Sequence, residues 1–302
     1  MQRVAQQARQ IPVRGFLRVL LTAFLAAVAG PLWAQSFDGD RLSAVLESQP
    51  EPQQTRYPWR HPYETLEFFE VTPGTVVVEA FPGDGWYSRI LADYLGPEGT
   101  LVGADYAPDM FPLFGFFTAE QLEERRSWAE NWVAGAADGG YGNGASLVGF
   151  TLGSLPEDLV GQADTVLFVR ALHNLFRFEN QGGFLTRALQ DAWNVLKPGG
   201  VVGVVQHEAR PDMPDDWAGG ASGYIKRQDV IAAMQDAGFE YVGSIDINEN
   251  PQDQPGTDDA VWRLQPVMNT SRDDPELKTQ LMAVGESNRA TLKFRKPMQE
   301  TP

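Results

Sequence analysis

The chain has 302 residues, 24 lysines and arginines against 40 aspartates and glutamates, and no cysteine. The absence of cysteine excludes disulfides, thiol nucleophiles, thiolate zinc sites and acyl-cysteine anchors. A net charge of −16 argues against nucleic acid as a partner, because phosphate binding requires a concentrated basic surface. With 43% hydrophobic and 11% aromatic residues, the chain can bury a large core, and we expect a globular protein.

Residues 1–34 have the pattern of a secretory signal. Arginines without acids precede an apolar run over residues 19–29, and Pro31-Leu32-Trp33-Ala34 offers a small residue before Gln35. The run is shorter than the roughly 20 residues that cross a bilayer as a helix. We therefore expect cleavage, export and no stable membrane span afterwards. An uncleaved membrane tether and a wrongly chosen start site are the alternatives.

The next segment, residues 35–62, is polar and rich in proline, so an irregular lead-in is expected there. One domain over residues 63–297 and a tail over 298–302 complete the chain. The domain begins with a predicted helix over 62–69 and a strand over 75–79. An amphipathic helix ending at Leu95 and a strand over 100–105 then complete a strand–helix–strand unit.

Strands and helices continue to alternate after this unit. Further strands are predicted at 146–150, 164–169, 201–206, 240–247 and 289–295, with helices at 183–196 and 226–237. This alternation predicts a mostly parallel sheet with helices on both faces and ligands at the carboxyl ends of its strands. Residues 106–145 are rich in aromatics and then glycine, which predicts a helical insertion ending in a mobile loop. Its aromatics pack onto the sheet, or it forms a lid. Residues 248–288 give no clear pattern.

A constellation of acids and glycines follows the first two predicted strands. Glu79 ends the first strand, a turn with Gly83 and Gly85 opens the helix, and Asp105 ends the second strand. Glycines let a backbone approach a ligand, while a terminal acid can accept hydrogen bonds from a ribose diol. The pattern favours a nucleotide site, and a tight turn with a surface aspartate is the alternative.

The type of nucleotide depends on the residues at the turn. A dinucleotide fingerprint requires glycine or alanine where this chain has Ser88, and it does not need Glu79. Asp84, inside the turn, suits a sulfonium cation better than a pyrophosphate, which it would repel.

The segment Glu79-Ala80-Phe81-Pro82-Gly83-Asp84-Gly85 resembles the first motif of the class I S-adenosylmethionine-dependent methyltransferases. It departs at Phe81, where that superfamily usually has glycine. Over residues 56–297 the chain is similar to a group of exported bacterial methyltransferases of little-characterised activity. The matching segments are Arg60-His61-Pro62, Glu64-Thr65-Leu66, Phe68-Phe69, Pro82 to Ser88, Leu196 to Gly200 and Leu292 to Pro297.

The resemblance implies a Rossmann-like fold with a seven-stranded, mostly parallel sheet and an antiparallel last strand between the fifth and sixth. It implies that S-adenosylmethionine is bound, with Glu79, Pro82, Gly83, Asp84 and Gly85 around its methionine and ribose parts. The implied partner of the ribose hydroxyls is Asp105. The next residue, Tyr106, stacks on adenine or is an ordinary loop aromatic.

His173 follows the fourth predicted strand and His207 follows the fifth. In the fold that the resemblance implies these two strands are neighbours, so the histidines are expected at adjacent carboxyl ends. Either is a candidate general base for an acceptor that must lose a proton. Alternatively, they hydrogen-bond loops or shape the pocket. No ligand spacing supports a metal site, and we expect His61 to lie outside the chemistry or to cover the cofactor.

The sequence therefore favours an exported, periplasmic enzyme that methylates a small molecule with S-adenosylmethionine. Because this cofactor is a cytoplasmic metabolite, an exported non-catalytic ligand-binding protein with the same fold is the rival hypothesis. A nicotinamide-dependent oxidoreductase is a third, disfavoured by Glu79 and Ser88. Neither the methyl acceptor nor the oligomeric state is indicated by the sequence.

Overall fold

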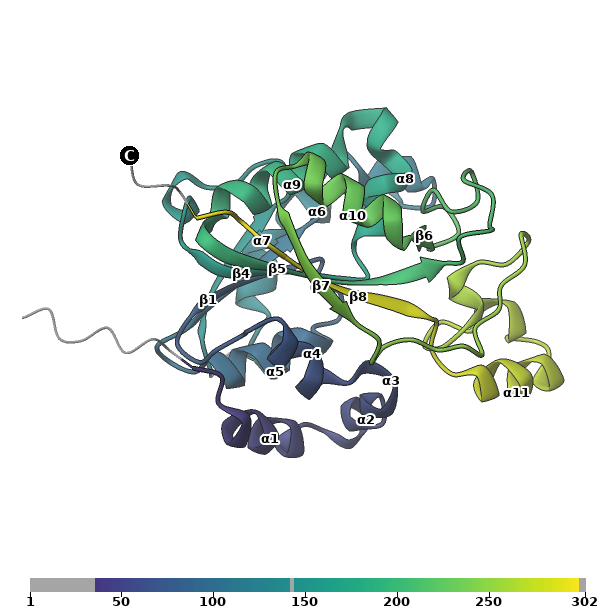
Figure 1. Ribbon diagram of the computed structural model, residues 1–302, viewed down its shortest axis with the longest axis horizontal. Coiled ribbons are helices and arrows are strands. Elements are labelled where there is room, and N and C mark those ends of the chain that lie inside the picture. Colours follow the sequence, from purple (N-terminus) through teal and green to yellow (C-terminus); the bar gives the residue numbers. More distant parts are fainter. Residues whose placement is uncertain (1–35, 142–143, 299–302) are drawn as a thin grey trace, which may run out of the picture. The chain divides into compact units, whose positions relative to one another are not determined.

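A twisted sheet crosses the centre of the protein (Figure 1). The computed structural model describes residues 36–141 and 144–298. The strands are β1 (Val76–Ala80), β2 (Thr100–Asp105), β3 (Ser146–Thr151), β4 (Ala163–Val169), β5 (Leu196–Ala209), β6 (Ile225–Lys226), β7 (Glu240–Ile245) and β8 (Arg289–Arg295). Their order is β3-β2-β1-β4-β5-β8-β7, with the two-residue β6 beside β5.

Strands β1 to β5 pair in parallel, and β8 is antiparallel to both of its neighbours, β5 and β7. The mostly parallel sheet and the antiparallel last strand are thus confirmed. The short β6 is an addition to the seven predicted strands. The predicted turn at 197–200 lies inside β5, whose pairing with β4 shifts register between Ala163 and Thr165.

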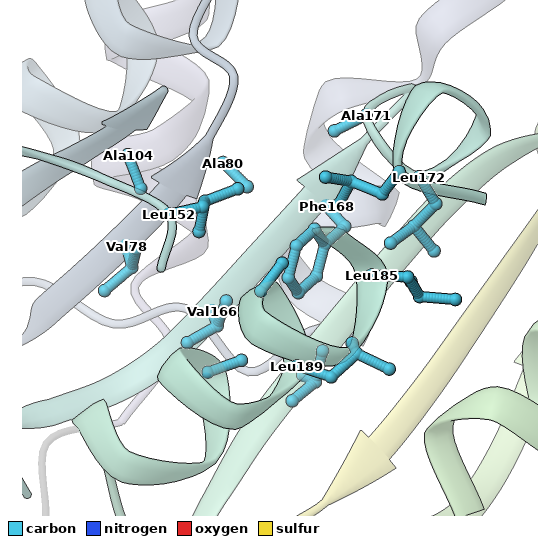
Figure 2. Close-up of a cluster of buried hydrophobic side chains, with 14 of the residues drawn as sticks. Val78, Ala80, Ala104, Leu152, Val166, Phe168, Ala171, Leu172, Leu185 and Leu189 are labelled. Atoms are coloured by element: carbon cyan, nitrogen blue, oxygen red, sulfur yellow. The ribbon is translucent and has the colours of Figure 1, made fainter. Parts of the chain in front are cut away.

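Side chains alternate between the two faces of the sheet and meet a hydrophobic cluster on each. One face carries Val78, Val102, Val166 and Val204, which pack with helices α8 (Leu172–Gly182), α9 (Phe184–Val195) and α10 (Arg227–Asp236). Figure 2 shows Leu185 and Leu189 of α9 lying against Val166 and Phe168 of β4.

The opposite face carries Val77, Leu101, Leu167 and Val205. It is covered by helices that include α1 (Gly39–Ser48), α4 (Pro62–Phe68), α5 (Trp86–Leu95) and α7 (Trp128–Ala134). A Cβ on Gly203 of β5 would lie 2.5 Å from the Phe69 ring, so glycine is required for this close approach.

The irregular lead-in expected over residues 35–62 is wrong, because this segment is largely helical. It contains α1, α2 (Glu51–Gln54) and α3 (Tyr57–Arg60). Its prolines lie at the starts of helices, where the missing N–H has no helical partner to lose and the fixed φ favours the first turn. Leu42 and Leu46 are buried one turn apart on α1, so tertiary packing holds these short helices.

The insertion over 106–145 is helical, as expected, and contains η1 (Phe111–Phe114), α6 (Ala119–Arg126) and α7. Phe111 and Trp132 are buried, whereas Phe116 is 70% exposed. The aromatics therefore pack onto the sheet only in part. Residues 142–143, where a mobile loop is expected, lie outside the described residues.

The segment without a clear pattern, 248–288, holds two short turns of helix, η3 (Val261–Arg263) and η4 (Asn269–Ser271), and helix α11 (Pro275–Val284). A further turn, η2 (Glu157–Leu159), precedes β4. The predicted signal at 1–34 and residues 299–302 of the tail lie outside the described residues. Within residues 36–141 and 144–298, no helix combines the length and apolarity needed to cross a membrane.

Candidate functional site

The turn after β1 bends sharply through residues in the left-handed region. Phe81, Gly83 and Gly85 have φ values of 54°, 62° and 77°. A Cβ on Gly83 would have no neighbour closer than 4.0 Å, whereas one on Gly85 would meet Tyr141 at 3.1 Å. The predicted glycine turn is therefore present and leads directly into α5. Phe81 takes the strained conformation where glycine would be strain-free.

Glu79, at the end of β1, is a buried carboxyl group directed toward α5. Ser88 Oγ donates a hydrogen bond of 2.7 Å to its Oε2. Burial raises the pKa of Glu79 to about 8, and the nearby charge of Asp84 acts in the same direction. Near neutral pH this carboxyl group keeps a proton until a cation approaches it.

Asp105 lies on the same face of the sheet as Glu79. Glu79 is in register with Gly103 of β2, and Asp105 is two residues further along that strand. Its Oδ1 accepts from the Tyr106 N–H at 2.8 Å, and Arg125 of α6 donates to Oδ2 at 3.4 Å. Burial raises the pKa of Asp105 to about 6 despite these bonds. The two acids that the sequence singles out therefore lie on one face of the sheet, near the carboxyl ends of neighbouring strands.

Tyr106 is part of the core. Its ring is buried and stacks on Phe81, with centroids 4.4 Å apart, and its hydroxyl donates to the Ala171 carbonyl at 2.6 Å. In this structure the buried ring of Tyr106 is not open to adenine. Tyr106 does lie in the loop after β2, as the alternative interpretation has it, but it is buried there and ties the end of β2 to the start of α8.

His173 and His207 come together near the carboxyl ends of β4 and β5. His207 lies inside β5 and not after it, because this strand extends to Ala209. The ring centroids of the two histidines are 5.7 Å apart, and His207 Nδ1 lies 2.6 Å from Ser287 Oγ. Trp262 lies beside His173 and Tyr224 beside His207, with ring centroids 6.0 and 6.1 Å away. Trp262 and Tyr224 thus form an aromatic wall beside the two histidines, in which Tyr224 is fully buried.

Both histidines are poor bases in this structure. Burial, and secondarily the charge of Arg170, lowers the pKa of His173 to about 4. Burial and the charge of His173 lower the pKa of His207 well below its ordinary value, and Arg170 and Arg289 add to this effect. They are neutral at physiological pH, and nearby negative charge would restore their basicity.

A cluster of arginines that the sequence does not predict lies beside this site. Arg60 Nε and Arg289 Nη1 lie 2.9 and 2.8 Å from Glu286, which also pairs with Arg56. The Arg60 guanidinium lies 4.5 Å from the centre of the Trp86 ring. The one signal in the sequence is Arg60-His61-Pro62. Arg60 pairs with Glu286, while His61 at φ 41° joins α3 to α4, which Pro62 begins.

The donor set at the turn fits S-adenosylmethionine. Glu79 suits the cationic amino-acid end, and Asp105 can accept from ribose hydroxyls once its long contact to Arg125 is exchanged. The ring of Phe81 stacks on the ring of Tyr106. Trp86 leaves a buried Nε1–H without a hydrogen-bond partner among the described residues.

A separate surface pocket and the question of metal binding complete the description of candidate sites. A surface pocket of about 680 Å³ is lined by Thr75, Asp164 and Gly200, at the opposite ends of β1, β4 and β5. In the described part of the chain, no three or more His, Cys, Asp or Glu side chains group closely enough to hold a metal ion.

Comparison with known proteins gives distant similarities, and no family model matches the chain. The arsenite methyltransferase of Halobacterium salinarum (strain ATCC 700922 / JCM 11081 / NRC-1) is 27% identical over 183 residues, which cover 58% of this chain and 40% of that protein. The chain thus spans less than half the length of this curated relative.

Among solved structures, the cyclase SpnF has 19% identity and a TM-score of 0.49, covering 79% of this chain and 80% of its own. A SAM-dependent methyltransferase from Aquifex aeolicus has 17% identity and a TM-score of 0.43, covering 70% and 94%.

The sheet itself has the arrangement that the first motif implies. Five parallel strands in the order β3-β2-β1-β4-β5 are followed by the antiparallel β8, inserted before β7. The sheet therefore has the Rossmann-like strand order that the resemblance implies, and over 183 residues the chain is similar to the Halobacterium arsenite methyltransferase.

Proposed function

We propose that the chain binds S-adenosylmethionine at the turn after β1 and transfers its methyl group to a small-molecule acceptor. The observation that carries this proposal is the pair of buried carboxyl groups, Glu79 and Asp105, on one face of the sheet beside the Gly83–Gly85 turn. The cofactor would supply an activated methyl group. Glu79 would neutralise its cationic end, and Asp105 would hold its ribose.

The acceptor side of the site would be formed by the aromatic wall and the two histidines. Methyl transfer is an in-line displacement that depends above all on positioning. Neutral His173 and His207 can orient an acceptor by hydrogen bonds. Either becomes an effective base only if its pKa rises on binding.

The name of the Halobacterium relative gives arsenite as its methyl acceptor, but we do not propose arsenite as the acceptor of this chain. Trivalent arsenic is thiophilic, and the chain has no cysteine to hold a soft centre. An acceptor with oxygen or nitrogen functions suits the arginines, histidines and aromatics of this site better.

Calorimetric titration of the purified chain with S-adenosylmethionine, its demethylated product S-adenosylhomocysteine and NAD tests the function. Heat with the first two compounds and none with NAD is expected. Absence of heat with both adenosyl compounds, at protein concentrations that detect micromolar binding, would overturn the proposal. Heat with NAD alone would favour the oxidoreductase.

A non-catalytic ligand-binding protein is the second candidate, and two contacts favour it. Phe81 stacks on Tyr106, and Arg125 pairs with Asp105, so both features of the nucleoside side already have partners within the protein. Binding of S-adenosylhomocysteine without methyl transfer to any of a broad panel of acceptors would support this alternative.

Export to the periplasm remains part of the proposal, based on the signal pattern of residues 1–34. N-terminal sequencing of the protein from fractionated cells tests it. A periplasmic chain beginning at Gln35 is expected, and an intact Met1 in the cytosol would contradict both cleavage and export.

A further inference from the structure

The arginine cluster beside the turn has a large local excess of positive charge. Arg56, Arg60, Arg170 and Arg289 gather around a single carboxylate, Glu286. This excess occurs in a chain whose net charge is −16. Buried like charges are destabilising unless they are compensated.

Neighbouring acids do not supply the missing negative charge. Glu208, next to His207 on β5, forms a two-bond pair with Arg227, at 2.7 and 2.9 Å. Asp253 pairs with Arg263 at 2.6 Å. Each of these carboxylates therefore already has its own arginine partner.

Several donors of the cluster also lack acceptors. Arg56 Nε, Arg289 Nε and Trp86 Nε1 are buried without a hydrogen-bond partner among the described residues. The half-buried guanidinium of Arg170 makes no hydrogen bond or ion pair with any residue that the structure describes. Buried polar groups are normally satisfied, so these unsatisfied donors require an explanation.

The cluster connects the cofactor turn to the candidate acceptor site. Trp86, which carries Arg60 against its ring, follows Gly85 directly. Arg170 lies at the end of β4, three residues before His173. Arg289 is in register with His207 across β8 and β5. The positive charge therefore extends from the turn to both histidines.

We propose that Arg56, Arg60, Arg170 and Arg289 form a subsite for an oxyanion, a carboxylate or phosphate group carried by the methyl acceptor. The acceptor assignment rests on the proposed function. Guanidinium groups present planar, forked donors that match such oxyanions. Burial and the neighbouring arginines lower the pKa of Arg170 to about 9, which a bound anion would reverse.

Inorganic phosphate is the probe for this subsite, titrated calorimetrically at constant ionic strength. Arg170→Gln is the informative variant, because Arg170 anchors no other described side chain. Arg126→Gln, on the exposed surface of α6, is the control with the same charge change. We expect phosphate affinity to fall about tenfold or more in Arg170→Gln and to be unchanged in Arg126→Gln. Undetectable phosphate binding, or equal affinity in both variants, would overturn the subsite.

The carboxylate of the cofactor is the other possible source of the anion, and two nucleosides separate the sources. S-adenosylhomocysteine carries that carboxylate, whereas 5′-methylthioadenosine lacks the whole amino-acid part. We expect Arg170→Gln to leave both affinities unchanged. A loss for S-adenosylhomocysteine alone would assign the arginines to the cofactor and overturn the acceptor role.

Failure of the proposed function gives a different result from failure of the oxyanion subsite. A wild-type chain that binds phosphate through Arg170 but binds neither nucleoside would keep the oxyanion site and lose its acceptor role. Thermal unfolding of each variant shows whether it is folded, and Arg170→Lys gives a second measurement. Lysine keeps the charge but loses the forked donors, so we expect an intermediate phosphate affinity.

Discussion

We expect Glu79 to lose a proton when a cationic ligand binds beside it. Its buried carboxyl group has a pKa of about 8, so it is mostly protonated at pH 7 and should ionise when the cationic end of S-adenosylmethionine arrives. We expect binding at pH 7 to release about one proton. Calorimetry in two buffers with different ionisation enthalpies measures this release.

Glu79→Gln should abolish the proton release, whereas Glu47→Gln, on the exposed side of α1, should leave it intact. An equal release from the wild type and Glu79→Gln would mean that another group titrates and that the cationic end lies elsewhere.

Asp105 is the second single-residue test of the site. Asp105→Ala removes the proposed acceptor of the ribose hydroxyls and should weaken S-adenosylhomocysteine binding by roughly 1.5 to 3 kcal/mol. Asp109→Ala, an exposed aspartate a few residues further on, is the control and should bind normally. Unchanged affinity in Asp105→Ala would place the ribose away from β2.

At the scale of elements, Glu286 fastens α3 of the lead-in to β8. Glu286→Gln leaves its arginine partners without their common carboxylate and should reduce the free energy of unfolding by about 3 to 5 kcal/mol. Urea denaturation measures this loss. Glu98→Gln, exposed in the turn after α5, should change stability little, and a similarly small effect for Glu286→Gln would show that the cluster is not structural.

The lead-in also shows why some elements could not be predicted from sequence. Pro50, Pro52, Pro58 and Pro62 read as breaks in a polar segment, yet they begin three helices. Helices of four residues are not stable alone, and here contacts with α5 and β8 hold them. Gln53, for example, donates to the Trp86 carbonyl at 2.9 Å. Such contacts span more than thirty residues and leave no local pattern.

At the scale of the whole molecule, we expect the buried histidine pair to lower stability in mild acid. His173, with a folded-state pKa of about 4, and His207, also lowered, stay neutral while unfolded histidines protonate below about 6.5. At these two groups the unfolded state therefore binds more protons, and their contribution to the free energy of unfolding decreases as pH falls from 6.5 toward 5. Glu79 and Asp105 act oppositely: their pKa values are raised to about 8 and about 6, so their contributions to stability are lost as pH rises through those values.

Urea unfolding at several pH values checks this expectation. His173→Gln should make the free energy of unfolding decrease less between pH 6.5 and 5. His61→Gln, on the link between α3 and α4, is the matched control and should leave this decrease unchanged. An unchanged slope in His173→Gln would show that the histidine pair does not govern the acid response.

Local sequence was sufficient for the main strands of the sheet and for the turn after β1, whereas the place of the antiparallel last strand came from the resemblance. Some features depend only on residues near one another in the chain and can therefore be recognised in the sequence. They include strand runs such as Thr75-Val76-Val77-Val78, the alternation with helices, and the spacing from Glu79 to Asp105. The proximity of His173 and His207 followed from the strand order that the resemblance implies.

Tertiary structure alone decided the charge at the site. Arg60, Arg170 and Arg289 come from three distant segments, and Glu286 pairs with residues more than 200 positions away. Tyr106 and Phe81 likewise became a buried stack through the pairing of β1 with β2. Periodicity records which face of an element is apolar, but packing in three dimensions determines which charged groups share a buried space.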